Sequence, residues 1–200
     1  MFQQSAGAFV NDIGITSDVF PDEVCSAAQA QCIDAADGSI EVRADLLDKV
    51  GLYSSILAPP VRPSANNPDI IAGKQLFNDL GCVACHVPSY TTGTHPTLPE
   101  LSDQLIWPYT DLLLHDMGAD LADGRPVGLA SGQQWRTPPL WGIGLFPTIN
   151  KHQRLLHDGR ADGVAAAIVW HGGEAEAARD AFAALSANDR ALVVKFVESL

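Results

Sequence analysis

Two cysteines and a histidine stand close together at Cys82-Val-Ala-Cys85-His86, the spacing with the most definite chemistry in this 200-residue chain. Cysteines three positions apart lie one helical turn apart, so both thiols can reach the two vinyl groups of one haem. His86 follows directly and can turn its imidazole toward the iron as the proximal ligand. A redox dithiol should follow a strand in a βαβ unit, and a zinc site needs a second Cys or His pair, yet no cysteine follows Cys85. The motif therefore predicts one covalently bound haem c.

A sixth iron ligand is not specified by this motif, and Met117 is the first candidate. The chain has two methionines, and the other is Met1 at its start. His115, in the same short segment as Met117, and His152 are the alternatives, although each histidine can equally be a hydrogen-bonded structural residue. A methionine ligand raises the haem potential relative to a second histidine, so this choice matters for function.

The other two cysteines, Cys25 and Cys32, cannot hold a second haem, because Ile33 and not a histidine follows Cys32. Haem c is attached outside the cytoplasm, so we expect the full-length protein to be periplasmic. In that oxidising compartment Cys25 and Cys32 can close a local disulfide. Two free thiols remain the alternative. A chain made without export would miss the attachment machinery and carry no haem.

Composition excludes several function classes. The chain has 12 Lys and Arg against 24 Asp and Glu, a net charge of −12, so nucleic acid and anionic membrane surfaces are poor partners. Its longest apolar run, Val164–Trp170, is too short to span a bilayer. The N-terminus lacks the basic start and the apolar centre of a signal peptide.

Hydrophobic spacing predicts a mainly helical, all-α chain with long irregular loops and no convincing strand. Four prolines between residues 58 and 68 indicate a linker, which divides an N-terminal extension (1–66) from a second domain (67–200). In the second domain, Asn67 and Pro68 predict the start of a helix that ends at Gly81, and Ser186 is predicted to cap the final helix. The remaining helices are expected at about 41–57, 109–117, 163–170 and 174–185.

The helix that leads into the Cys-His motif, with Gly73 and Phe77, resembles the first helix of class I cytochromes c. The final helix, Asp189–Leu200, resembles the last helix of those domains, which crosses the first. This resemblance implies a class I cytochrome c-like domain for residues 67–200.

Further motifs occur in order along the rest of the chain, at residues 109–118, 135–141, 155–160 and 170–175. Together with the haem motif they resemble the di-haem oxidoreductases described as thiol oxidoreductases, distant relatives of bacterial di-haem cytochrome c peroxidases. The resemblance implies two haem domains, one peroxidatic and one that accepts electrons and passes them on. This chain matches the C-terminal haem domain only, so we expect it to be part of a longer protein whose N-terminal haem domain is missing here.

One position departs from the peroxidase pattern. Those enzymes carry a methionine ligand before His-Asp-Gly, where this chain has Leu156, so the methionine role moves to Met117. Arg136 is a candidate partner for a haem propionate, because a guanidinium suits a carboxylate.

Three functions follow from these observations. The first is electron relay from a donor protein or small redox protein to the missing haem domain. The second is reaction of peroxide at an open iron in this domain, with His115 assisting proton transfer. The third is a haem-free interaction module.

Overall fold

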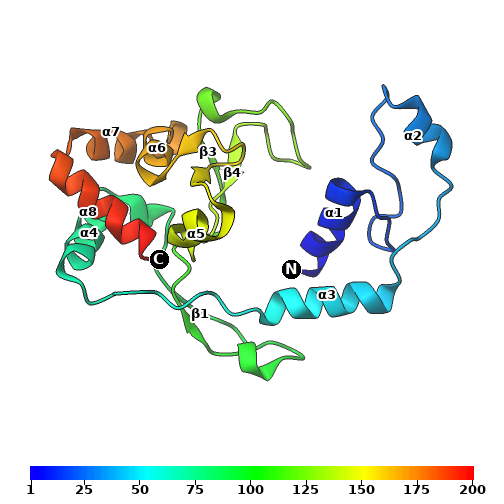
Figure 1. Ribbon diagram of the computed structural model, residues 1–200, viewed down its shortest axis with the longest axis horizontal. Helices are drawn as coiled ribbons and strands as arrows, with labels where there is room; N and C mark the ends of the chain where they lie inside the picture. Colours follow the sequence, from blue (N-terminus) through cyan, green and yellow to red (C-terminus); the bar gives the residue numbers. More distant parts are fainter. The chain divides into compact units, whose positions relative to one another are not determined.

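A computed structural model describes residues 1–200, which form two compact units, Met1–Ala58 and Pro59–Leu200 (Figure 1). The proline-rich segment predicted to be a linker therefore begins at the boundary between the units and is counted with the second one. None of the helices combines the length and the apolar character needed to span a bilayer.

The first unit is built on α1 (Phe2–Ile13) and α3 (Ala44–Ile56), which pack against each other. Ala6, Val10 and Leu47 are buried between them. Only α3 lies within a helix predicted from the sequence. Helix α1 was not predicted from the sequence. Its positions Phe2, Ala6 and Val10 are spaced four residues apart, but the small residues around them make the apolar periodicity weak.

A third, short helix, α2 (Ala30–Ala35), buries none of its residues. Cys25 and Cys32 form a disulfide that ties α2 to the segment preceding it. Because a six-residue helix without packing is marginal in water, this cross-link is the main restraint on it.

The second unit holds the other helices, and their ends follow local chemistry. The side chain of Asn67 accepts a hydrogen bond from the Asp69 amide at the start of α4, and the Ser186 hydroxyl accepts one from the Asp189 amide at the start of α8. Gly81 follows α4 with φ of 81°, a left-handed conformation that glycine adopts without strain. The helices are α4 (Pro68–Asp79), α5 (Phe146–Asn150), α6 (Val164–Val169), α7 (Glu176–Ala184) and α8 (Ala187–Glu198).

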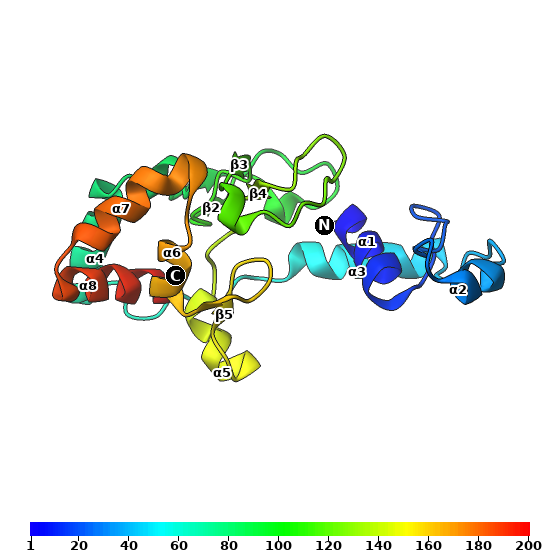
Figure 2. The same cartoon turned by 90° about the horizontal axis from the view of Figure 1, so that it is seen from above.

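Helices α4 and α8 lie side by side in both views (Figures 1 and 2). Gly73 on α4 faces the backbone of α8 so closely that a Cβ atom there would lie 2.7 Å from the Leu192 carbonyl carbon and 2.8 Å from Cβ of Phe196. Gly73 is therefore the residue that allows the two backbones to approach. Around this contact Phe77, Tyr109 and Phe196 form an aromatic cluster with ring centroids 5.2 to 6.1 Å apart.

The expectation of no strands is wrong, because the second unit contains three two-stranded antiparallel sheets. Each is too short to show alternation in the sequence, and backbone pairing stabilises it where loop segments meet. The pairs are β1 (Tyr90–Thr91) with β2 (Leu105–Ile106), β3 (Leu114–Asp116) with β4 (Gln134–Arg136), and β5 (Arg154–Leu155) with β6 (Ala161–Asp162).

The helix predicted at 109–117 is also wrong. Tyr109 and Leu112 have φ of 52° and 61°, so the chain cannot run through them as a helix. The Leu112 amide donates a hydrogen bond to the Thr110 hydroxyl, and the Leu113 amide donates one to the Asp111 carboxylate. These side-chain hydrogen bonds form local turns that compete with a helix. The other predicted helices of the second unit are present, and the chain is helix-rich as expected.

Candidate functional site

The Cys-His motif occupies a short 3-10 helix, η1 (Cys82–Ala84), directly after α4. Gly81 changes the direction of the chain between them, and the His86 amide donates to the Cys82 carbonyl at 2.9 Å, which closes the turn. Cys82 and Cys85 are both free and partly buried. One tight turn thus presents two thiols and the following imidazole together.

Both thiols are held in the protonated form. Burial raises the pKa of Cys82 to about 11. The pKa of Cys85 is raised by burial and then by the negative charges of Asp111 and Glu174. The reactive cysteine of a redox dithiol needs a lowered pKa that favours the thiolate. The environment therefore argues against a redox dithiol.

His86 is held by one hydrogen bond, from its Nδ1 to the backbone oxygen of Tyr109 at 3.0 Å. Because a carbonyl oxygen only accepts, Nδ1 carries the proton and Nε2 keeps its lone pair. Metal-binding histidines are commonly oriented by such a bond. Burial is the largest influence on the pKa of His86 and lowers it, so the imidazole is neutral near pH 7.

Tyr109 is held in its strained conformation from both sides. Its neighbour Thr110 donates its amide to the Val87 carbonyl at 3.0 Å and its hydroxyl to the Thr137 carbonyl at 2.6 Å. On the other flank, the Leu140 amide donates to the Pro108 carbonyl at 2.9 Å. A bulky residue with positive φ persists only where its surroundings over-determine it. Here these contacts fix the carbonyl that orients His86.

A second partly buried histidine, His171, lies beside His86. The ring centroids of His86 and His171 are 6.4 Å apart, and their planes are inclined by 43°. The Nδ1 of His171 donates to the Ala167 carbonyl at 2.7 Å, and burial lowers the pKa of this imidazole too. His171 was not among the residues expected from the sequence. Its only signal was its place within the motif at 170–175.

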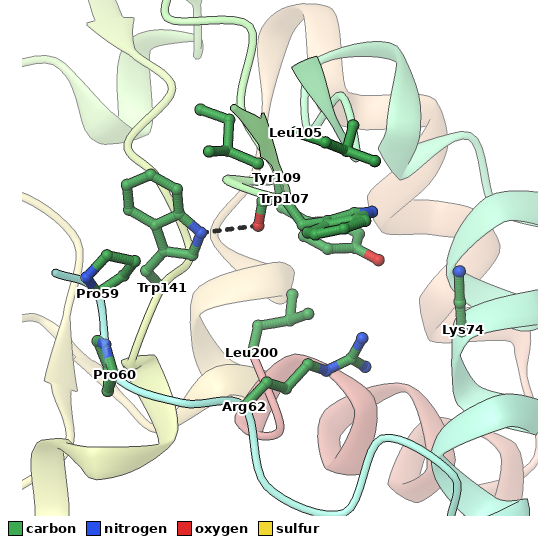
Figure 3. A pocket seen from close by; sticks show the side chains of 10 residues that line it. Pro59, Pro60, Arg62, Lys74, Leu105, Trp107, Tyr109, Trp141 and Leu200 are labelled. Atoms are coloured by element: carbon green, nitrogen blue, oxygen red, sulfur yellow. Dashed lines mark hydrogen bonds between the residues drawn. The ribbon is translucent and has the colours of Figure 1, made fainter. Parts of the chain in front are cut away.

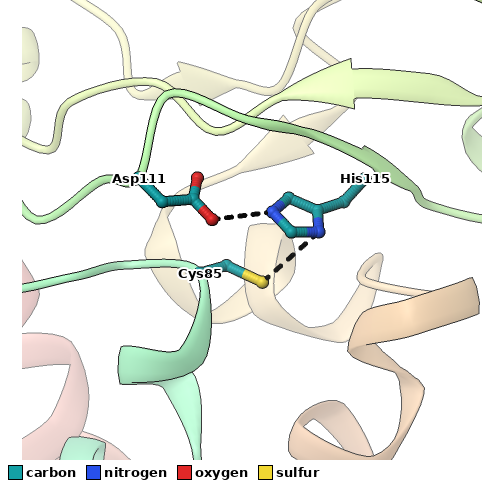
Figure 4. A group of neighbouring side chains, drawn as sticks. All are labelled: Cys85, Asp111 and His115. Carbon is teal, nitrogen blue, oxygen red and sulfur yellow. Dashed lines mark hydrogen bonds and ion pairs between the residues drawn. The ribbon is translucent and has the colours of Figure 1, made fainter.

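Beside Cys85, His115 lies between the carboxylates of Asp111 and Glu174. Figure 4 shows Asp111 on one side of the ring and Cys85 on the other. The Nε2 of His115 lies 2.9 Å from Asp111, its Nδ1 lies 2.9 Å from Glu174, and Cys85 Sγ is 3.8 Å from the same Nδ1. Hydrogen bonds to Glu174 and then to Asp111 raise the pKa of His115. Cys85, Asp111 and His115 have the atom types of a metal site, but carboxylates already bond to both nitrogens of the imidazole. We interpret the group as an ion-paired cluster.

Glu174 also joins two motifs that are far apart in the sequence. It accepts from the Asp116 amide at 2.9 Å, and the two glycines before it lie against the same segment. A Cβ on Gly172 would be 2.9 Å from the Met117 carbonyl oxygen, and one on Gly173 would be 2.7 Å from the Gly118 nitrogen. The segments 116–118 and 172–174 therefore pack backbone against backbone.

One protein family matches this chain. Its description is "Di-haem oxidoreductase, putative peroxidase", and the match covers residues 1–200. The chain belongs to the di-haem oxidoreductase family. No curated protein and no solved structure shows significant similarity to it. The resemblance inferred from the ordered motifs is thereby confirmed at the level of the family.

The residues of this di-haem oxidoreductase fit a haem. Cys82 and Cys85 are unpaired thiols one turn apart, and the donor atom of His86 that remains available is its Nε2. The three groups are of the kinds that haem c attachment requires, and the pKa values leave the thiols neutral and the imidazole unprotonated.

The other candidates for contact with a haem lie in different settings. Met117 is partly buried, and its amide donates to the Gln133 carbonyl at 3.0 Å. His152 is exposed and accepts from the Arg154 amide at 3.2 Å. Arg136, on β4, is exposed and forms no salt bridge, so its guanidinium has no acidic partner.

A pocket of about 430 Å³ lies beside the Tyr109 side chain (Figure 3). Arg62 and Lys74 face it, and Trp141 closes one wall by donating its indole N–H to the Trp107 carbonyl at 2.8 Å. No His, Cys, Asp or Glu lines it. The pocket therefore offers no thiol, imidazole or carboxylate ligand, whereas the η1 turn offers two thiols and an imidazole.

Proposed function

We propose that the second unit of this di-haem oxidoreductase holds one haem c, bound covalently by Cys82 and Cys85 with His86 as the proximal ligand, and that it transfers electrons. The observation that carries the proposal is the hydrogen bond from His86 Nδ1 to Tyr109, which leaves Nε2 as the ligating atom next to two neutral thiols. When bound, the haem supplies one-electron chemistry at its iron. The protein residues would attach it and orient its ligand.

The fold is consistent with this role. The crossing of α4 and α8 at Gly73 supports the class I cytochrome c-like domain that the resemblance implies. The cluster of Phe77, Tyr109 and Phe196 packs behind His86, with the Phe77 ring centroid 6.0 Å from that of His86. A rigid apolar surrounding of this kind lowers the reorganisation needed when the charge of a site changes.

The partners and location follow from the same proposal. Electrons would come from a donor protein and pass to the N-terminal haem domain of the full-length, periplasmic protein. The net charge of −12 favours a basic donor. Arg136, exposed and free of acidic partners, is available to a haem propionate.

The test is expression of the full chain with export and haem attachment, followed by mass measurement and haem staining of the denatured protein. We expect the mass of one haem, retained after denaturation. The double variant Cys82→Ala/Cys85→Ala should lose the covalent haem. The matched control is Cys25→Ser/Cys32→Ser, which removes two thiols elsewhere and should keep it.

An unmodified wild-type mass under these conditions would contradict the haem site. A loaded protein that is high-spin and reacts rapidly with peroxide would instead favour the peroxide-reactive alternative over electron relay. A haem-free chain that still binds a partner protein would favour the interaction module.

A further inference from the structure

We propose that His171 is the second axial ligand of the haem iron, opposite His86. This inference rests on the proposed function, because it concerns the coordination of the same haem. It differs from the ligands expected from the sequence, which were Met117, His115 and His152.

The separation of the two rings is the first argument. A metal–imidazole bond is about 2.0 Å long, and the ring centre lies about 1.2 Å behind the ligating nitrogen, so two imidazoles on opposite sides of one metal have centroids roughly 6.4 Å apart. His86 and His171 have centroids 6.4 Å apart. Stacked rings such as Trp135 and His157, at 3.7 Å, lie much closer, but tilted rings such as Phe77 and His86 lie 6.0 Å apart. The separation therefore leaves room for an iron, and the free ring nitrogens are what point to one.

The hydrogen bonds of the two histidines are the second argument. Both use Nδ1 to donate to a backbone carbonyl, Tyr109 at 3.0 Å for His86 and Ala167 at 2.7 Å for His171. Each ring therefore keeps the same nitrogen, Nε2, with a lone pair for a metal. Both residues are partly buried, and no protein group forms a hydrogen bond with either Nε2. Neither nitrogen is sealed inside the protein, so each is accessible to a metal as well as free of competing bonds.

The loop that follows His171 fixes its position. His171 comes directly after α6, and the next two residues are glycines that pack on the backbone of residues 116–118. Gly173 has φ of 53°, which a larger residue adopts only with strain. Glu174 then binds the Asp116 amide. This anchored turn gives His171 a defined place, as a metal ligand requires.

The rival ligands are less well placed. Both ring nitrogens of His115 are taken by carboxylates, and His152 is exposed. Met117 lies in the segment 116–118 on which the glycine turn packs, so its backbone supports the position of His171. Two histidine ligands would give this haem a lower potential than a His–Met pair.

The test is spectroscopy of the exported, haem-loaded chain and of its variants. We expect a wild-type low-spin spectrum without the charge-transfer band of methionine ligation. His171→Gly should become high-spin and recover a low-spin spectrum when imidazole is added. His171→Met should show the methionine band or a high-spin iron, with a raised midpoint potential. Met117→Leu and His152→Ala are controls that should keep the wild-type spectrum.

Failure of this inference can be distinguished from failure of the proposed function. A covalently loaded chain whose spectrum is unchanged in His171→Gly, or is lost in Met117→Leu, would overturn the His171 assignment and leave the haem site intact. A chain that gains no haem in a host competent for attachment would overturn both.

Discussion

His86 and Tyr109, 23 residues apart in the chain, are joined by a hydrogen bond from the imidazole Nδ1 to the backbone oxygen at 3.0 Å. The acceptor is a buried tyrosine with φ of 52°. A strained backbone is thus used to orient the imidazole that follows the two cysteines. Strain of this kind is frequent where a ligand must be held in place.

The support of Tyr109 can be tested at Thr110. Thr110→Val removes a buried hydroxyl that donates to Thr137 at 2.6 Å and accepts from the Leu112 amide at 2.8 Å. We expect a loss of about 2 kcal/mol, because partners are left unsatisfied. In loaded protein the potential should rise, since a weaker bond makes His86 less electron-rich. Thermal unfolding and redox titration measure these effects. Thr148→Val, at an exposed position, is the control; equal effects there would contradict the prediction.

The contact between α4 and α8 predicts that Gly73→Ala is strongly destabilising. The added Cβ would collide with the backbone of Leu192 and with Phe196, and α8 would have to move away. We expect a loss of about 2–3 kcal/mol despite the better helix propensity of alanine. Denaturant unfolding provides the measurement. Gly93→Ala is the matched control, because no atom lies within 4 Å of its Cβ position. A Gly73→Ala chain as stable as this control would disprove the close approach.

The cluster of Asp111, His115 and Glu174 predicts a defined pH dependence. The pKa of His115 is raised above 6.5, so its contribution is complete below pH 6.5 and is lost as pH rises through the raised value. The pKa values of Asp111 and Glu174 are lowered from 3.8 and 4.5, so their contribution is lost as pH falls through the lowered values. All three interactions are present between about pH 4.5 and 6.5.

NMR titration of the His115 ring protons checks this prediction. Glu174→Gln should lower the pKa of His115, because a carboxylate partner is removed. Glu176→Gln, which instead changes a contact to Arg179 at 2.8 Å, should leave it unchanged. A His115 pKa at or below 6.5 in the wild-type chain would show that the imidazole is not clamped.

Reduction of the Cys25–Cys32 disulfide should loosen α2 locally. The helix buries no residue, and its amides bond only within the segment, as in Ala36 to Cys32 at 3.1 Å. The cross-link closes a short loop, so loop-closure entropy alone is worth about 2.5 kcal/mol. We expect faster amide exchange at Cys32 and Ala36 after reduction, measured by hydrogen exchange. Exchange in α4 and α8 should not change; parallel loosening there would mean that reduction acts on more than α2.

Several helices of the second unit could be predicted, because the residues that begin and end them are neighbours in the sequence. Asn67 and Gly81 mark the ends of one helix and Ser186 the start of another, since capping depends on neighbours in the chain. The short strands and the break at Tyr109 were not predictable. Pairing of Leu114 with Arg136 depends on loops that meet only in the folded state, so a segment with helical spacing became a strand.

By itself, the sequence determined which residues can attach a haem, because Cys82, Cys85 and His86 are neighbours in the chain and their chemistry needs nothing else. Only the tertiary structure decided which groups complete their surroundings. The carbonyl of Tyr109 and the ring of His171 reach His86 from positions distant in sequence, through a strained backbone and a glycine turn. No local sequence pattern predicts these contacts, because they arise from packing between segments that are distant in the chain.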